Sequence, residues 1–98
     1  EFQEELVTLF NTDTRSRIEN LRALVAAGDS ERASRQAHTV KGSAGNICAP
    51  RLRDLGLELE LTDAAADPRK AAELVDAMAA EFEVVCGLLD DFGVRSGG

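Results

Sequence analysis

Residues 68–92 read PRKAAELVDAMAAEFEVVCGLLDDF. Seven apolar positions in this stretch are separated alternately by four and three residues: Ala71, Val75, Met78, Phe82, Val85, Leu89 and Phe92. That period places them along one side of an α-helix. Asp67 and Pro68 provide a cap and a first-turn proline, and Gly93 follows as a stop signal. The spacing therefore predicts an amphipathic helix over residues 68–92.

Three more helices are predicted before this one, over residues 2–27, 30–47 and 50–64. The first precedes Gly28 and has a polar middle, residues 11–17, which leaves open a kink or a break. The third begins at the turn made by Ala49 and Pro50. Apolar residues at helical spacing define the second and third helices: Ala33, Ala37, Val40, Ala44 and Ile47, then Leu52, Leu55 and Leu59.

The composition favours an all-α protein. The chain has fifteen Ala and twelve Leu, and it has no Trp or Tyr. Its 98 residues suit one domain, residues 1–98. Four helices with short connections and one apolar stripe each can bury those stripes together. We therefore expect an antiparallel up-down four-helix bundle that closes its own core and is monomeric.

Charge and cysteine content limit the classes of partner. The chain has 11 Lys and Arg against 18 Asp and Glu, a net charge of −7, so we expect no nucleic acid partner. No apolar run approaches the ~20 residues of a membrane span, so we expect no direct membrane contact. Cys48 and Cys86 lie far apart, which indicates neither a metal site nor a disulfide framework. A cytoplasmic location fits these features.

The single histidine, His38, is predicted to point outward. At about 100° per residue, the apolar stripe of its helix is centred about 140° away from it. Lys41, Gly42 and Gly45 fall on the outward side, as does Ser34. Glycine inside a helix costs up to ~1 kcal/mol relative to alanine, but on an outward face it admits the surface of another molecule. An imidazole on such a face, with a lysine one turn away, suits nucleophilic or phosphoryl-carrying chemistry.

Residues 37–46, AHTVKGSAGN, resemble the HxxKG signature of histidine-containing phosphotransfer (HPt) domains. The resemblance extends over essentially the whole chain and implies that the phosphoacceptor is His38, on the second bundle helix. It would take a phosphoryl group from a receiver-domain aspartate and pass it to another receiver. Lys41 would stabilise phosphoryl charge, and Gly42, Gly45 and Ser34 would form the docking face. Cys48 departs from the family, in which many members have glycine.

Glu60 occupies a position where some family members place a Glu or Gln that orients the histidine, and Glu58 is the alternative. The resemblance also implies that Mg²⁺ belongs to the partner receiver, so we expect no bound cofactor and no metal site in this chain. Arginines near the His38 end would either steer an acidic receiver or simply be solvated: Arg32, Arg35, Arg51 and Arg53. The parent is expected to be a hybrid sensor kinase, whose cytosolic part would include this domain, or a freestanding carrier.

Two other functions are weighed against the phosphorelay. The first is a four-helix interaction module without phosphoryl chemistry, in which His38 is inert. The second is the dimerisation and phosphoacceptor domain of a sensor kinase, where an acidic residue typically follows the histidine at once; here Thr39 follows. The chain has no Gly-rich nucleotide-binding loop, so we do not expect it to phosphorylate itself or to act as an enzyme.

Overall fold

The computed structural model describes the backbone of residues 2–91 and the side chains of residues 8–89. Its four helices are α1 (Phe2–Ala26), α2 (Ser30–Asn46), α3 (Pro50–Glu60) and α4 (Pro68–Asp91), and no strand occurs within that range. The described part of the chain is therefore all-α. The expected end of the last helix at Phe92 lies outside the described residues.

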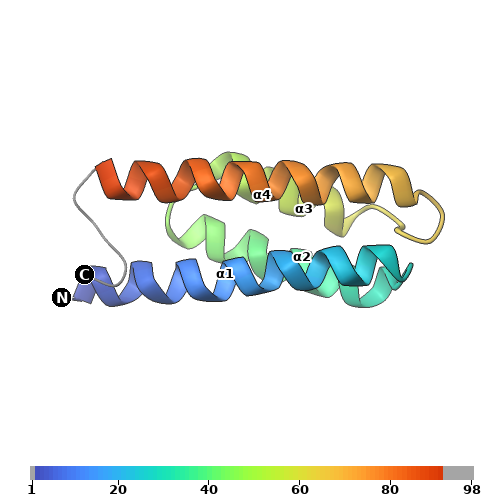
Figure 1. Ribbon diagram of the computed structural model, residues 1–98, viewed down its shortest axis with the longest axis horizontal. Coiled ribbons are helices and arrows are strands. Elements are labelled where there is room, and N and C mark those ends of the chain that lie inside the picture. Colours follow the sequence, from blue (N-terminus) through green and yellow to red (C-terminus); the bar gives the residue numbers. More distant parts are fainter. Residues whose placement is uncertain (1, 92–98) are drawn as a thin grey trace.

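The helices form a ring in which each packs on two neighbours. α1 packs on α2 and α4, and α3 packs on the same two helices. In Figure 1 the sequence colours show α1 running in one direction along the molecule and α4 returning beside it, with the shorter α2 and α3 behind them. The His38 helix thus lies between α1 and α3.

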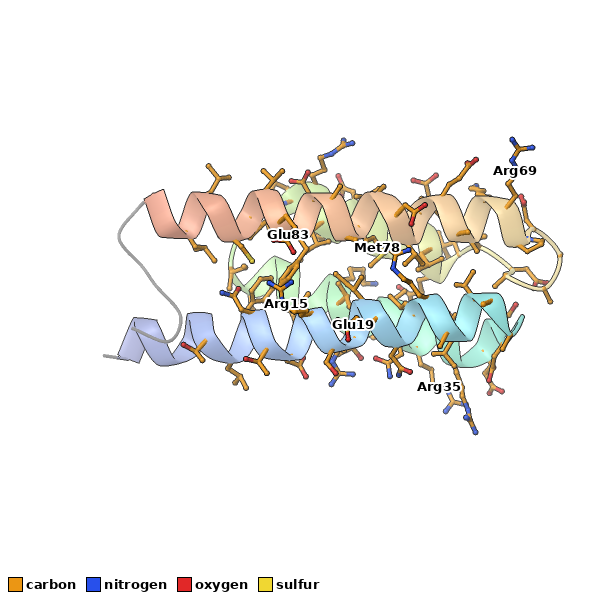
Figure 2. The ribbon with its side chains drawn as sticks, in the orientation of Figure 1. Arg15, Glu19, Arg35, Arg69, Met78 and Glu83 are labelled. Carbon is orange, nitrogen blue, oxygen red and sulfur yellow. The ribbon has the colours of Figure 1, made fainter. Side chains whose placement is uncertain are left out.

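The buried side chains come from all four helices. Leu21 of α1, Val40 of α2 and Leu52 of α3 are fully buried, as is Met78, which points into the interior in Figure 2. Phe82 packs against Phe10 with ring centroids 5.9 Å apart. Of the expected stripe on residues 68–92, every position within 8–89 is buried except Leu89, which is partly buried. Burial of these side chains supplies the main stabilisation of the fold.

The polar middle of α1 does not break the helix, because its side chains find partners on neighbouring helices. The Arg15 guanidinium donates to Glu83 of α4 at 3.0 Å, and the two side chains reach toward each other in Figure 2. The same guanidinium lies 4.9 Å from the centre of the Phe82 ring. Arg17 bonds both Asp13 and, on α2, Gln36. Contacts between helices therefore override the weak local pattern.

Each helix boundary around α2 has an identifiable capping contact. Gly28 has φ +71° and ends α1, where the Asp29 N–H reaches the carbonyl of Leu24. The Asp29 carboxylate then accepts the Arg32 N–H at 3.2 Å and caps α2. After α2, Cys48 adopts φ +57°, and the next N–H reaches back to Ala44. Cys48 thus occupies the left-handed position that glycine favours after a helix.

The third helix ends at Glu60, so the expected extension to residue 64 is wrong. Asp63 accounts for the early end: its Oδ1 accepts the N–H groups of Ala65 and Ala66, which folds the chain into a turn. Ser30 at the start of α2 donates its hydroxyl to the same Oδ1 at 2.5 Å. Asp67 then accepts the Lys70 N–H and starts α4. No helix among residues 2–91 combines the length and the apolar character that a membrane span requires.

Candidate functional site

His38 lies on the solvent side of α2. Its side chain is 65% exposed, whereas Ala37 and Val40 on the same helix are fully buried. The outward orientation expected from the helical period is therefore present in the structure. An exposed imidazole on a helix whose opposite side is packed in the core can be approached by a second macromolecule without opening the core.

Glu60, the last residue of α3, holds one side of the imidazole. Its Oε2 lies 3.0 Å from His38 Nδ1, and its Oε1 lies 2.9 Å from Lys41 Nζ. The second contact is an ion pair by distance rather than a well-aligned hydrogen bond. One carboxylate thus bridges the histidine and the lysine. Of the two candidate glutamates, the structure places Glu60 at the imidazole, whereas Glu58 lies 4.0 Å from Lys70.

The electrostatics of this cluster keep Glu60 ionised. Its pKa lies below the ordinary 4.5, first because of the adjacent Lys41 ammonium and also because of its contact with His38, while desolvation opposes the shift. A carboxylate can only accept, so Nδ1 must carry the proton in this contact. In that tautomer the lone pair is on Nε2. The nitrogen that is free to act as a nucleophile is therefore the one that Glu60 does not contact.

Gly42 and Gly45 leave the helix surface beside His38 flat. A Cβ atom on Gly42 would meet nothing within 4 Å, and one on Gly45 would meet only the Arg53 side chain, at 4.0 Å. Packing inside the domain therefore does not require either glycine. Their placement near an exposed histidine leaves room for an incoming surface.

The model of the Hpt domain family matches residues 5–84, which include the histidine, the lysine and the bridging glutamate. The chain belongs to the Hpt domain family. No curated protein and no solved structure matches the chain at a significant level. Hpt domains are phosphocarriers of His–Asp phosphorelays and interact with receiver domains. The family expected from the HxxKG signature is confirmed.

The Ser34 hydroxyl, expected on the docking face, has a hydrogen-bond partner inside this Hpt domain. Its side chain is partly buried, and its hydroxyl donates to the main-chain carbonyl of Glu60 at 3.0 Å. The hydroxyl is therefore engaged between α2 and α3. This hydrogen bond gives Ser34 a structural role that the helical period did not indicate.

Gly56 is a site residue that the sequence pattern did not reveal. It is buried at the contact of α3 with α2, where an added Cβ would lie 3.2 Å from the Ala37 carbonyl oxygen and 3.2 Å from the Lys41 Cβ. The missing side chain lets the two helices approach closely one turn of α3 before Glu60. A glycine in the middle of a predicted helix was the available signal, because helix stability alone disfavours it.

The four arginines expected near the His38 end all have acidic neighbours. Arg35 pairs with Glu31 at 2.6 Å and extends away from the bundle in Figure 2. Arg53 lies 3.4 Å from Asp54. Arg32 and Arg51 lie 3.7 Å and 3.3 Å from Asp29 and Glu81. Each arginine is partly neutralised by its acidic neighbour, which limits its contribution to steering an acidic partner.

Metal ligation and thiol chemistry are the two alternatives to a histidine-based site in the described residues. Within that part of the chain, no three His, Cys, Asp or Glu side chains come together as a metal site would require. Cys48 is an exposed thiol, and Cys86 is a partly buried thiol whose Sγ lies 3.5 Å from Asn11 Oδ1. His38, Lys41 and Glu60 remain the cluster best suited to chemistry.

Proposed function

We propose that this Hpt domain carries phosphoryl groups on His38. The histidine lies on the second helix of an antiparallel up-down bundle and takes the group from an aspartyl phosphate of one receiver domain. It then passes the group to an aspartate of another. The bridge that Glu60 makes between His38 Nδ1 and Lys41 Nζ carries this proposal, because it leaves Nε2 as the outward nucleophile.

The transfer step follows from this geometry. The lone pair of His38 Nε2 attacks phosphorus, the bond from phosphorus to the aspartate oxygen breaks, and that oxygen leaves as carboxylate. The ring keeps its Nδ1 proton and gains positive charge, which the Glu60 carboxylate at 3.0 Å stabilises. In the return step the same ring is the leaving group, and Nδ1 again keeps its proton.

The Lys41 ammonium stabilises the negative charge of the phosphoryl group. In the unphosphorylated domain its ammonium is held by Glu60, one turn along α2 from the imidazole. A lysine has a flexible stem and three donors, so its ammonium can contact a phosphoryl oxygen while remaining close to Glu60. Lys41 is therefore assigned to charge stabilisation rather than to proton transfer.

Gly42 and Gly45 are assigned to receiver docking. In this proposal the Mg²⁺ that the reaction uses is bound by the receiver, and the domain acts as a cytoplasmic monomer without a cofactor of its own. A phosphocarrier of this kind needs an accessible imidazole and a surface that its partner can approach. The open space over both glycines supports this assignment.

A phosphotransfer assay tests the proposal. The domain is mixed with Mg²⁺ and a receiver carrying labelled aspartyl phosphate, and acid-labile, alkali-stable label is followed on the wild type and on His38→Gln. Label on the wild type alone is expected. Label on His38→Gln would refute the assignment, and no label from any of several receivers would favour an interaction module in which His38 is inert.

A further inference from the structure

Three successive turns of α2 hold the end of α3 and the turn that follows it. Ser30 donates its hydroxyl to Asp63 at 2.5 Å, Ser34 donates to the Glu60 main-chain carbonyl at 3.0 Å, and His38 contacts the Glu60 carboxylate at 3.0 Å. Residues four apart share one face of a helix, so the three contacts form a single row. The row ends at the imidazole.

Glu60 lies at a helix terminus, where carbonyl groups lack partners within the helix. The N–H of Leu61 bonds the Leu57 carbonyl, and the Thr62 hydroxyl bonds that of Glu58 at 2.7 Å. The Glu60 carbonyl instead accepts from Ser34, on another helix. The backbone of the residue that contacts His38 is thereby tied to the helix that carries His38.

We propose that Ser34 is a positioning residue for His38, acting through the main chain of Glu60. Its hydroxyl fixes the last residue of α3, so that the carboxylate reaches Nδ1 and Lys41 together. Loss of the hydroxyl would leave the Glu60 carbonyl without this donor and would let the helix end rotate. Ser34 touches neither the imidazole nor the phosphoryl group in this proposal. Its effect on transfer rests on the phosphocarrier function proposed above, whereas its effect on the imidazole does not.

The first experiment measures the tautomer of His38 at neutral pH from the ¹⁵N chemical shifts of its two ring nitrogens. The wild type is expected to show a protonated Nδ1, and Ser34→Ala to shift toward the other tautomer, as Glu60→Ala does. Ser34→Thr keeps the hydroxyl and should retain the wild-type shifts. Thr62→Ala is the matched control, because it removes a hydroxyl from a carbonyl at the same helix end without unlinking α2 from α3.

Wild-type shifts in Ser34→Ala or in Glu60→Ala would overturn the proposal. So would a change of equal size in Thr62→Ala, because general loosening of the helix end would then explain the effect. These readouts need no receiver domain. If the wild type accepts no phosphoryl group while the tautomer responds as expected, the proposed function fails and the positioning role of Ser34 stands.

A double-mutant cycle on the rate of phosphoryl transfer supplies the second experiment. Ser34→Ala is expected to slow acceptance about threefold to tenfold, the range of one hydrogen bond. In a Glu60→Ala background it should have no further effect, since Ser34 acts through that carboxylate. An equal slowing in both backgrounds would overturn the proposal.

Discussion

Gly56 of α3 lies so close to Lys41 of α2 that a Cβ atom on the glycine would stand 3.2 Å from the Cβ of the lysine. Gly42, the residue after Lys41 on α2, by contrast faces open space. The two glycines therefore have different roles: Gly56 lets two helices of the domain approach closely, and Gly42 leaves a surface free. Their substitution by alanine separates these roles.

Gly42→Ala is expected to raise the free energy of unfolding by about 0.5–1 kcal/mol, the gain of alanine over glycine in an exposed helix. The free energy of unfolding of Gly56→Ala should be about 1–3 kcal/mol lower than that of Gly42→Ala, because the added Cβ crowds the Lys41 backbone and the Ala37 carbonyl. Urea denaturation of both variants checks this. Equal stabilisation would contradict the close approach of α2 and α3.

Gly42→Gln is expected to block docking without disturbing the histidine. The longer side chain would project into the space left open over α2. Phosphoryl transfer from a receiver should slow by about tenfold, equivalent to about 1.4 kcal/mol. Direct phosphorylation of His38 by phosphoramidate, a small donor, should be unchanged. An equal loss with both donors would show that the substitution damages the site itself.

Cys48→Gly is expected to stabilise the domain by about 1 kcal/mol, because Cys48 has φ +57° and side chains with a Cβ pay for that conformation. Cys48→Ala keeps the Cβ and serves as the control, with no comparable gain. Thermal or urea unfolding under reducing conditions measures both. If the alanine variant gained as much as the glycine variant, the thiol rather than the backbone would be responsible.

Thr14→Val is expected to raise the free energy of unfolding by roughly 1 kcal/mol. Thr14 is fully buried, and its hydroxyl has no hydrogen-bond partner among the described residues. Valine has nearly the same shape and removes the cost of an unsatisfied buried hydroxyl. Thr12→Val on the exposed side of α1 should change stability by less than about 0.5 kcal/mol. A destabilised Thr14→Val would indicate that the hydroxyl has a partner after all.

The turn after α3 should weaken in acid. The pKa of Asp63 lies below its ordinary 3.8 because the Ser30 hydroxyl and then the Ala65 and Ala66 N–H groups donate to the ionised carboxylate, against a small opposing effect of burial. Because the folded carboxyl is more acidic than the unfolded one, this stabilisation is complete above that ordinary value. It is lost as the pH falls through the lower, folded-state pKa.

Urea denaturation of the wild type and of Asp63→Asn over a series of pH values measures this effect. The stability advantage of the wild type should be constant near neutral pH and shrink below about pH 3.8. An advantage that stays constant into strong acid would contradict the ionised contact with Ser30.

Most of the helical architecture could be predicted locally. The period of the apolar residues from Ala71 onward identified α4 before any packing was known, and the same period placed His38 on the outer side of α2. The end of α3 could not be predicted in this way. It depends on Asp63, whose carboxylate folds the next residues into a turn and bonds Ser30 from a distant part of the chain.

The same distinction between local pattern and tertiary contact applies to the candidate site. The sequence by itself determined which side of α2 carries His38, Lys41 and Gly42, because residues on one helix are related by a fixed rotation. It also placed the chain in its family through the signature around His38. Only the tertiary structure decided that Glu60 rather than Glu58 meets the imidazole, that the Ser34 hydroxyl bonds the Glu60 carbonyl, and that Gly56 lets α2 and α3 approach closely. These relationships join α2 to α3, and local periodicity carries no information about the register of one helix against another.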